Sequence, residues 1–260
     1  ANYHILFLDK KASSSGAVKP PMAADLLDYY TAEQLRAHFL GLALDQKSVS
    51  FMPKPLNPNA NPNEADPVLK EGNLFTNVLN RLARSCFYTV QKYYDGVLPA
   101  GEVSESVKAD AIKACLDYEA AMYRIDTHKC MDLLDSYIRQ GNKYWARNSE
   151  LRKQTLIDCF HILRTRNSAQ ADKEGNDELR KQTLIDCFHI LRTCLLLTHP
   201  ITPKGTDMVR EYLNASEDIY SWEYFDEPLN RFISEGKPFK VLEPKVDFYV
   251  KHPSQFAEGR

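Results

Sequence analysis

The stretch ELRKQTLIDCFHILRT, residues 178–193, decides the fold class of this chain of 260 residues. Its apolar side chains have the spacing of one face of an α-helix, at Leu184, Cys187, Phe188 and Leu191. The predicted helix continues to about Leu197, and the pair His199-Pro200 ends it. An apolar face of this length is stable only when other helices cover it, so we expect a mainly helical protein.

The same sixteen residues occur a second time, without a single difference, at 150–165. The triplet Arg-Asn-Ser at 147–149 also recurs at 166–168, so we interpret 150–168 as an insertion that duplicates the downstream helix. A solenoid needs three or more copies, which usually drift apart in sequence. A recent duplication, natural or engineered, explains two identical copies better.

Only the flanking residues can decide which copy occupies the core. The copy at 178–193 continues into Cys194-Leu195-Leu196-Leu197, and burying three Leu side chains stabilises a fold by roughly 4 to 9 kcal/mol before entropy costs. The copy at 150–165 continues into the polar Arg166-Asn167-Ser168. We therefore predict that 178–197 lies in the core, whereas 150–165 forms a surface helix or covers its apolar face by self-association.

Further segments with helical periodicity are found at 71–94, 104–140 and 206–213. The first ends at Asp95-Gly96, and the second has a break near 126–128. Thr31 and Gln34 have the spacing of a capping box, which predicts an apolar helix that runs to about Leu44. Together these segments predict an antiparallel helix bundle.

The N-terminal part has a different composition. A short β-rich run at 3–8 follows Ala1, and because no earlier strand can pair with it we expect a missing upstream part to supply the sheet. A polar loop follows at 10–16. Five prolines and four asparagines predict a loop or linker at 53–67, and the Pro-punctuated tail is expected to end in an extended segment at 246–250.

Composition and charge exclude several classes of protein. With 33 basic and 35 acidic residues the net charge is −2, so any RNA-binding surface has to be a local patch, and we expect no DNA partner. The longest strongly apolar stretch, Cys194 to Thr198, is far shorter than the roughly 20 residues that span a membrane, so we expect no membrane partner. The six cysteines and seven histidines lack the spacing of metal ligands, which predicts free thiols, a cytoplasmic protein and no metal site.

Three groups of polar residues are candidates for function. The segment Lys10-Lys11-Ala12-Ser13-Ser14-Ser15-Gly16 combines cations and hydroxyls that suit phosphate groups, although a solvated linker has the same composition. At 100° per residue, four side chains of the helix at 71–94 share an arc of about 100° that suits RNA or is an ordinary solvated face: Asn77, Asn80, Arg81 and Arg84.

The third group lies between 139 and 153, where five cations face one carboxylate, Glu150, to give a local charge of +4. The cations are Arg139, Lys143, Arg147, Arg152 and Lys153. Tyr144-Trp145 lies among them, and an aromatic pair between cations suits stacking on an unpaired base. A Trp that caps the end of the bundle explains the same pattern.

In this order the motifs resemble methionyl-tRNA synthetase, a class I aminoacyl-tRNA synthetase, over nearly the whole chain except 150–168. Lys11-Ala12-Ser13-Ser14-Ser15 stands where the family has KMSKS, and 26–36 looks like the segment that leads into the stem-contact helix. The segment 72–97 resembles the first helix of the anticodon domain, and Trp145 falls where the family places the Trp that contacts the anticodon. The resemblance therefore runs from the KMSKS-like loop through the anticodon-binding domain.

The family motif of that first helix has Asn and Arg four residues apart, and two registers fit this sequence. Counting back from Asp95-Gly96 favours Asn80 and Arg84 with one extra residue, whereas Asn77 and Arg81 have the same spacing one turn earlier. With Trp145, either pair is implied to bind the anticodon stem-loop of a tRNA.

The resemblance also implies the domains and the cofactor. Residues 1–68 are expected to form the KMSKS-like loop, stem-contact region and linker, and 69–260 the anticodon-binding bundle with its tail. In the complete enzyme Lys11, Ser13 and Ser15 would contact ATP with Mg²⁺. We expect neither ATP nor Mg²⁺ to be bound to this chain. The family's HIGH motif and nucleotide-binding sheet are missing, so the chain is expected to bind tRNA and to be inactive as a ligase without a catalytic domain.

The loop departs from the family pattern at Ala12, where the family has Met, and at Ser14, where it has a second Lys. Either Lys10 substitutes for that cation, or activation of methionine is slower or altered. This erosion also suits a stand-alone RNA-binding or regulatory module derived from the family. A structural interaction bundle is a third hypothesis, favoured slightly by an acidic tail: Glu217, Asp218, Glu223, Asp226 and Glu227.

Overall fold

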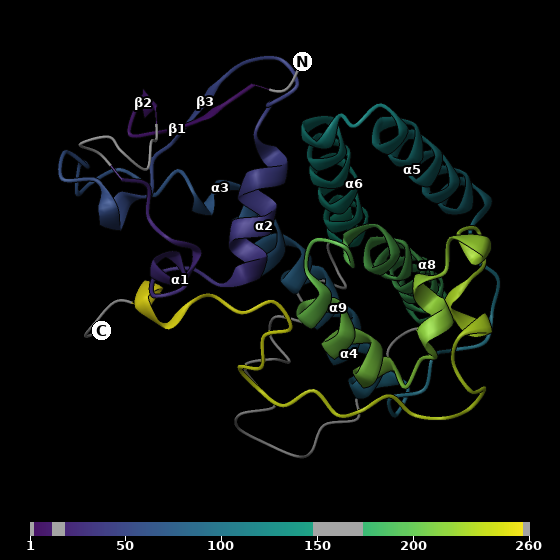
Figure 1. The fold of residues 1–260 in the computed structure, drawn as a ribbon. Coiled ribbons are helices and arrows are strands. Elements are labelled where there is room, and N and C mark those ends of the chain that lie inside the picture. Colours follow the sequence, from purple (N-terminus) through teal and green to yellow (C-terminus); the bar gives the residue numbers. More distant parts are fainter. Residues whose placement is uncertain (1–2, 12–18, 148–173, 257–260) are drawn as a thin grey trace.

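The computed structural model describes residues 3–11, 19–147 and 174–256. In this part of the chain a small N-terminal sheet lies beside a larger helical bundle, as Figure 1 shows. The mainly helical fold class predicted from the sequence is confirmed. None of the helices in the described ranges has the length and apolar character required to cross a membrane.

The sheet consists of β1 (Ile5–Phe7), β2 (Lys10–Lys11) and β3 (Val49–Phe51). The central strand β1 pairs antiparallel with β2 and parallel with β3, so its two neighbours both come from within the chain. The pairing of β1 with strands of this chain was not predicted, because β2 and β3 are too short to produce a sequence signal. A small apolar cluster lies beneath: Phe7, Leu26, Tyr30, Leu35, Phe51 and Val68.

Two short helices connect this sheet to the bundle, α1 (Ala23–Leu26) and α2 (Ala32–Gly41). The predicted capping box is confirmed: Gln34 N donates to Thr31 Oγ1 at 3.2 Å, and Thr31 N donates to Gln34 Oε1 at 3.0 Å. Across the junction Glu33 accepts a hydrogen bond from Gly205 N at 3.1 Å. The helix α2 therefore packs against both the small cluster and the bundle.

The helix predicted at 71–94 consists of three continuous parts. These are α3 (Leu69–Asn73), a π-helical segment η2 (Leu74–Leu79) and α4 (Asn80–Tyr93). A π-helix closes its hydrogen bonds from residue i to i+5 and is therefore wider than an α-helix. The stripe of polar residues was predicted from a rotation of 100° per residue, and this rotation does not hold through η2. The polar residues of η2 and α4 therefore need not share one face.

The predicted long helix at 104–140 is an antiparallel hairpin of α5 (Glu105–Tyr123) and α6 (Thr127–Arg147). The break is at the predicted position, where Ile125 has a positive φ of 59° and Asp126 Oδ1 accepts a hydrogen bond from Lys129 N at 2.9 Å. A hydrogen bond of 2.7 Å from Gln140 to Asp110 joins the two helices. The helix α6 extends beyond the predicted end and reaches Arg147.

The central helix is α8 (Glu174–Thr198), which contacts α4, α5 and α6. Every residue from 183 to 198 is buried, and the three leucines at 195–197 are at most 4% exposed. The prediction that 178–197 occupies the core is confirmed. The identical copy at 150–165 lies outside the described residues.

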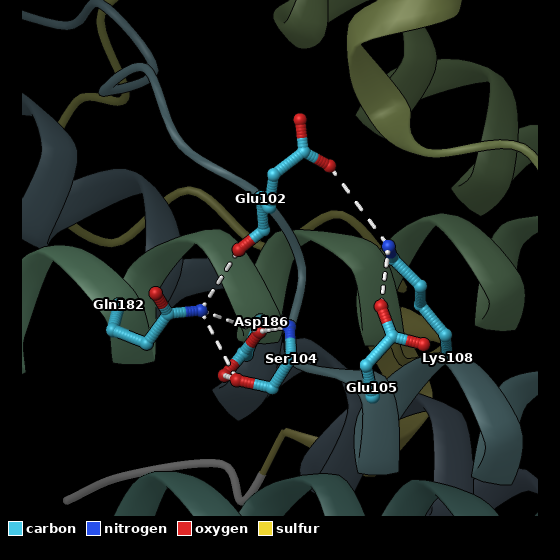
Figure 2. Close-up of polar contacts among 6 residues, drawn as sticks. All are labelled: Glu102, Ser104, Glu105, Lys108, Gln182 and Asp186. Carbon is cyan, nitrogen blue, oxygen red and sulfur yellow. Dashed lines mark hydrogen bonds and ion pairs between the residues drawn. The ribbon is translucent and has the colours of Figure 1, made fainter.

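A buried hydrogen-bond network fixes α8 against its neighbours. The carboxylate of Asp186 accepts hydrogen bonds from Ser104 N at 2.8 Å and Ser104 Oγ at 2.7 Å, at the start of α5. Gln182 Nε2 donates to Asp186 Oδ1 at 3.1 Å and to the carbonyl of Glu102 at 3.0 Å, as Figure 2 shows. Tyr144 OH on α6 donates to Asp186 Oδ2 at 2.6 Å. One side chain of α8 therefore joins three helices.

The C-terminal part consists of α9 (Pro203–Leu213) and short 3-10 helices, η3 (Glu217–Tyr220), η4 (Trp222–Tyr224), η5 (Leu229–Arg231) and η6 (Pro253–Gln255). The tail runs along the bundle and returns to the vicinity of α1 in Figure 1. Gln255 Nε2 donates to Gln34 Oε1 on α2 at 3.1 Å. The predicted extended segment at 246–250 is not a strand, and it buries Phe248 and Tyr249 in the bundle core. The tail is therefore part of the fold.

We expect Asp186→Asn to lower the free energy of unfolding by about 2 to 3 kcal/mol, because an amide cannot accept all of these buried hydrogen bonds. Urea denaturation would measure the loss. Asp158→Asn is the matched control, since Asp158 is the same position of the copy at 150–165, which the sequence predicts outside the core. Equal losses in the two variants would contradict the assignment of the second copy to the core.

Candidate RNA-binding site

The structure divides the four polar residues of the helix at 71–94 into two pairs. The first pair is Asn80 and Arg84, and both bind the carboxylate of Asp247 in the tail. Asn80 Nδ2 lies 2.6 Å and Arg84 Nη1 lies 2.9 Å from Asp247 Oδ1. Phe248 N donates to Asn80 Oδ1 at 3.0 Å. This pair anchors the tail on α4.

Asn80 is not part of the predicted exposed stripe. The tail covers its side chain, and only 4% of the residue is exposed. Arg84 is half-buried beside Tyr88. Burial opposes the charge of Arg84, but Tyr88 and Asp247 stabilise it and raise its pKa overall. Arg84 is therefore a charged residue already engaged within the protein.

The second pair, Asn77 and Arg81, is exposed at the junction of η2 and α4. Asn77 Nδ2 donates to Asn73 Oδ1 at 3.1 Å, which leaves its carbonyl oxygen for another donor. Arg81 forms no ion pair with any residue of the described ranges. The amide of Asn77 and the guanidinium group of Arg81, four residues apart, are therefore both exposed to solvent.

The C-terminal half of α6 packs against η2. Asn142 Nδ2 on α6 donates to the carbonyl of Val78 at 3.0 Å, and Val78 is the neighbour of Asn77. Lys143 and Arg147 lie on the same half of α6 and are exposed, whereas Arg139 is paired with Asp135 at 2.8 Å. Two cations of the predicted basic segment are therefore exposed on the half of α6 that contacts η2 through Asn142, and 148–153 lies outside the described residues.

Trp145 lies on this end of α6, but its side chain packs in the hydrophobic core and the residue is 7% exposed. Its neighbour Tyr144 is held by Asp186, and burial together with that hydrogen bond raises the pKa of the phenol, which stays protonated. In this conformation Trp145 offers no ring face to a base. The packing role that the sequence left open as an alternative describes this arrangement.

The KMSKS-like loop is described only in part. Lys10 and Lys11 form the exposed strand β2, and Ser13 and Ser15 lie at 12–18, outside the described residues. Exposed ammonium groups are suited to the charge of a nucleoside triphosphate. No cluster of His, Cys, Asp or Glu in the described ranges could hold a metal ion, and five cysteines there are free and buried: Cys86, Cys115, Cys130, Cys187 and Cys194.

Two partners in this site could not be found from sequence. Asp247 is 163 residues from Arg84, and no spacing rule connects positions so far apart. Asn142 lies within the basic segment and was overlooked because amides carry no charge. Their contacts decide which candidates are exposed.

The similarity to solved structures covers nearly the whole chain. Methionyl-tRNA synthetase of Mycobacterium tuberculosis bound to methionyl-adenylate matches with a TM-score of 0.66 and 16% identity over 95% of this chain. The ligand-free enzyme of that organism matches with a TM-score of 0.62 and 16% identity over 89%. The fold is similar to that of methionyl-tRNA synthetases. No family model and no curated protein sequence matches the chain.

This chain spans less than half of the similar proteins, 43% of the adenylate-bound synthetase and 41% of the ligand-free one. At this low identity the comparison establishes the fold alone. It supports the mainly helical class. It assigns no role to any individual residue of this chain.

We expect Trp145→Ala to lower the free energy of unfolding by about 3 to 5 kcal/mol, because it removes a large side chain from the core. Chemical denaturation would measure this loss, with Trp145→Phe as a variant that keeps most of the packing. An unchanged stability would show that Trp145 leaves the core readily, as stacking on a base requires.

Proposed function

We propose that this chain is the tRNA-binding C-terminal part of a methionine-tRNA ligase and recognises the anticodon. The observation that carries the proposal is the ordered set of motifs, from the KMSKS-like loop to Trp145, on a chain whose fold matches methionyl-tRNA synthetase over 95% of its length. A helical surface with paired amide and guanidinium groups is suited to unpaired bases and phosphates.

We place the RNA contact on Asn77 and Arg81 rather than on Asn80 and Arg84. Both pairs have the required spacing, but the second pair is committed to Asp247. Asn77 and Arg81 are exposed beside Val78, whose carbonyl accepts a hydrogen bond from Asn142 on α6. Lys143 and Arg147 are exposed on the same half of α6. These four side chains are defined as the RNA face of the bundle.

The buried position of Trp145 implies a conformational step if this residue stacks on the anticodon. The end of α6 would have to open so that the indole ring leaves the core. The RNA face provides the first contacts, and binding energy from those contacts would offset the cost of exposing the ring.

We expect Arg81→Ala to weaken binding of the anticodon stem-loop of a methionine tRNA by about 1 to 3 kcal/mol, with an unchanged melting temperature of the protein. Arg84→Ala should mainly reduce stability, because it removes the partner of Asp247. Filter binding would measure the affinities, with Arg124→Ala as an exposed control at the other end of the α5–α6 hairpin. A larger loss of affinity in Arg84→Ala than in Arg81→Ala would move the site one turn along the helix.

We also propose that the loop at 11–15 contacts ATP with Mg²⁺ during methionine activation, with Lys11, Ser13 and Ser15 on the phosphates. In a protein that includes the catalytic domain, Lys11→Ala should reduce methionine-dependent pyrophosphate exchange, because it removes a cation from the developing phosphate charge. Ser14→Lys should preserve or raise the exchange. If neither change alters it, the loop is a linker and the stand-alone RNA-binding module is the better proposal.

A further inference from the structure

An aromatic cavity of about 430 Å³ lies at the end of the α5–α6 hairpin opposite Trp145. Its walls come from the last turns of α5, the end of α8 and the 3-10 helices η3 and η4. Four aromatic side chains line it: Tyr118, Tyr123, Tyr220 and Trp222. Cavities of 300 to 1,000 Å³ are typical of small-molecule sites.

Hydrogen bonds and stacking fix two of these walls. Trp222 Nε1 donates to Glu119 Oε1 at 3.1 Å, which holds the indole ring beside the carboxylate. The ring of His199 stacks on Tyr220 with centroids 3.7 Å apart and an interplanar angle of 13°. Tyr220 OH donates to Asp207 Oδ1 at 3.1 Å. These contacts hold Trp222 and Tyr220 in place in the cavity wall.

The electrostatics of the cavity favour a cation. Glu119 is the one carboxylate among the lining residues that the structure describes, and none of those residues is Lys or Arg. Burial raises the pKa of Tyr118 and Tyr220, so both phenols stay neutral. The helices α5 and α8 both end here, and the C-terminus of a helix carries partial negative charge.

We propose that this cavity binds a small organic cation of the alkylammonium class. Aromatic faces attract such cations through their quadrupoles, and a methylated ammonium group is also apolar enough to fill a cavity of this kind. The carboxylate of Glu119 supplies the counter-charge, while Tyr220 and Trp222 supply aromatic walls whose hydrogen bonds hold them in place. An uncharged ligand of equal shape would gain the apolar contacts alone.

This proposal is independent of the RNA face. The helix α6 rises about 1.5 Å per residue, so Trp145 lies roughly 27 Å from the turn before Thr127, where the cavity is found. A chain that binds no tRNA could still bind the cation, and the two proposals fail separately.

The experiment compares choline with 3,3-dimethyl-1-butanol, which has the same shape without the charge. Isothermal titration calorimetry measures affinity for the full chain, and the indole signal of Trp222, assigned by Trp222→Phe, reports the location by NMR. We expect choline to shift this signal and to bind at least about tenfold more tightly than the neutral compound.

Glu119→Gln tests the counter-charge and should weaken choline binding by about tenfold. Glu223→Gln is the matched control, because it makes the same change on an exposed carboxylate next to Trp222 that does not line the cavity. Equal binding of choline and the neutral compound, absence of choline binding, or equal effects of the two variants would each overturn the proposal. The comparison of ligands on the unmodified chain needs no variant to fold.

Discussion

The carboxylate of Asp186 is fully buried at the junction of α5, α6 and α8, and its hydrogen bonds set the positions of these helices. A buried charge is costly unless several donors surround it, so Ser104, Tyr144 and Gln182 have to be in place together. A shift of one helix along another would leave the carboxylate without donors. Apolar packing alone would tolerate such a shift, because the leucines of α8 offer similar surfaces at successive turns.

This constraint reaches the candidate site through α6. Tyr144 is bound to Asp186, so the following residue Trp145 points into the core, while Lys143 and Arg147 remain exposed. On the other side Asn142 binds the π-helical segment and aligns it with α6. The RNA face that we propose therefore depends on how the core is connected, and its cations lie on the helices α4 and α6 rather than on a loop.

The sequence predicted the elements better than their contacts. The helix at 178–197 was predictable because its leucines continue past the duplicated segment, and the capping box at Thr31 was predictable because its partners are three residues apart. The partner of Arg84 was not, because Asp247 approaches only when the tail folds back. The choice between stacking and packing for Trp145 also stayed open, since both roles place an aromatic ring near a helix end. The residues of the RNA face remain predictions.

The central claim is that RNA meets the junction of η2, α4 and α6. Hydrogen–deuterium exchange of the chain with and without saturating methionine tRNA tests it most directly. The account predicts added protection in peptides that cover 74–82 and 142–147, and unchanged exchange at 116–123, where α5 ends on the opposite side of the hairpin. Protection confined to other parts of the chain, with none at 74–82, would contradict the account.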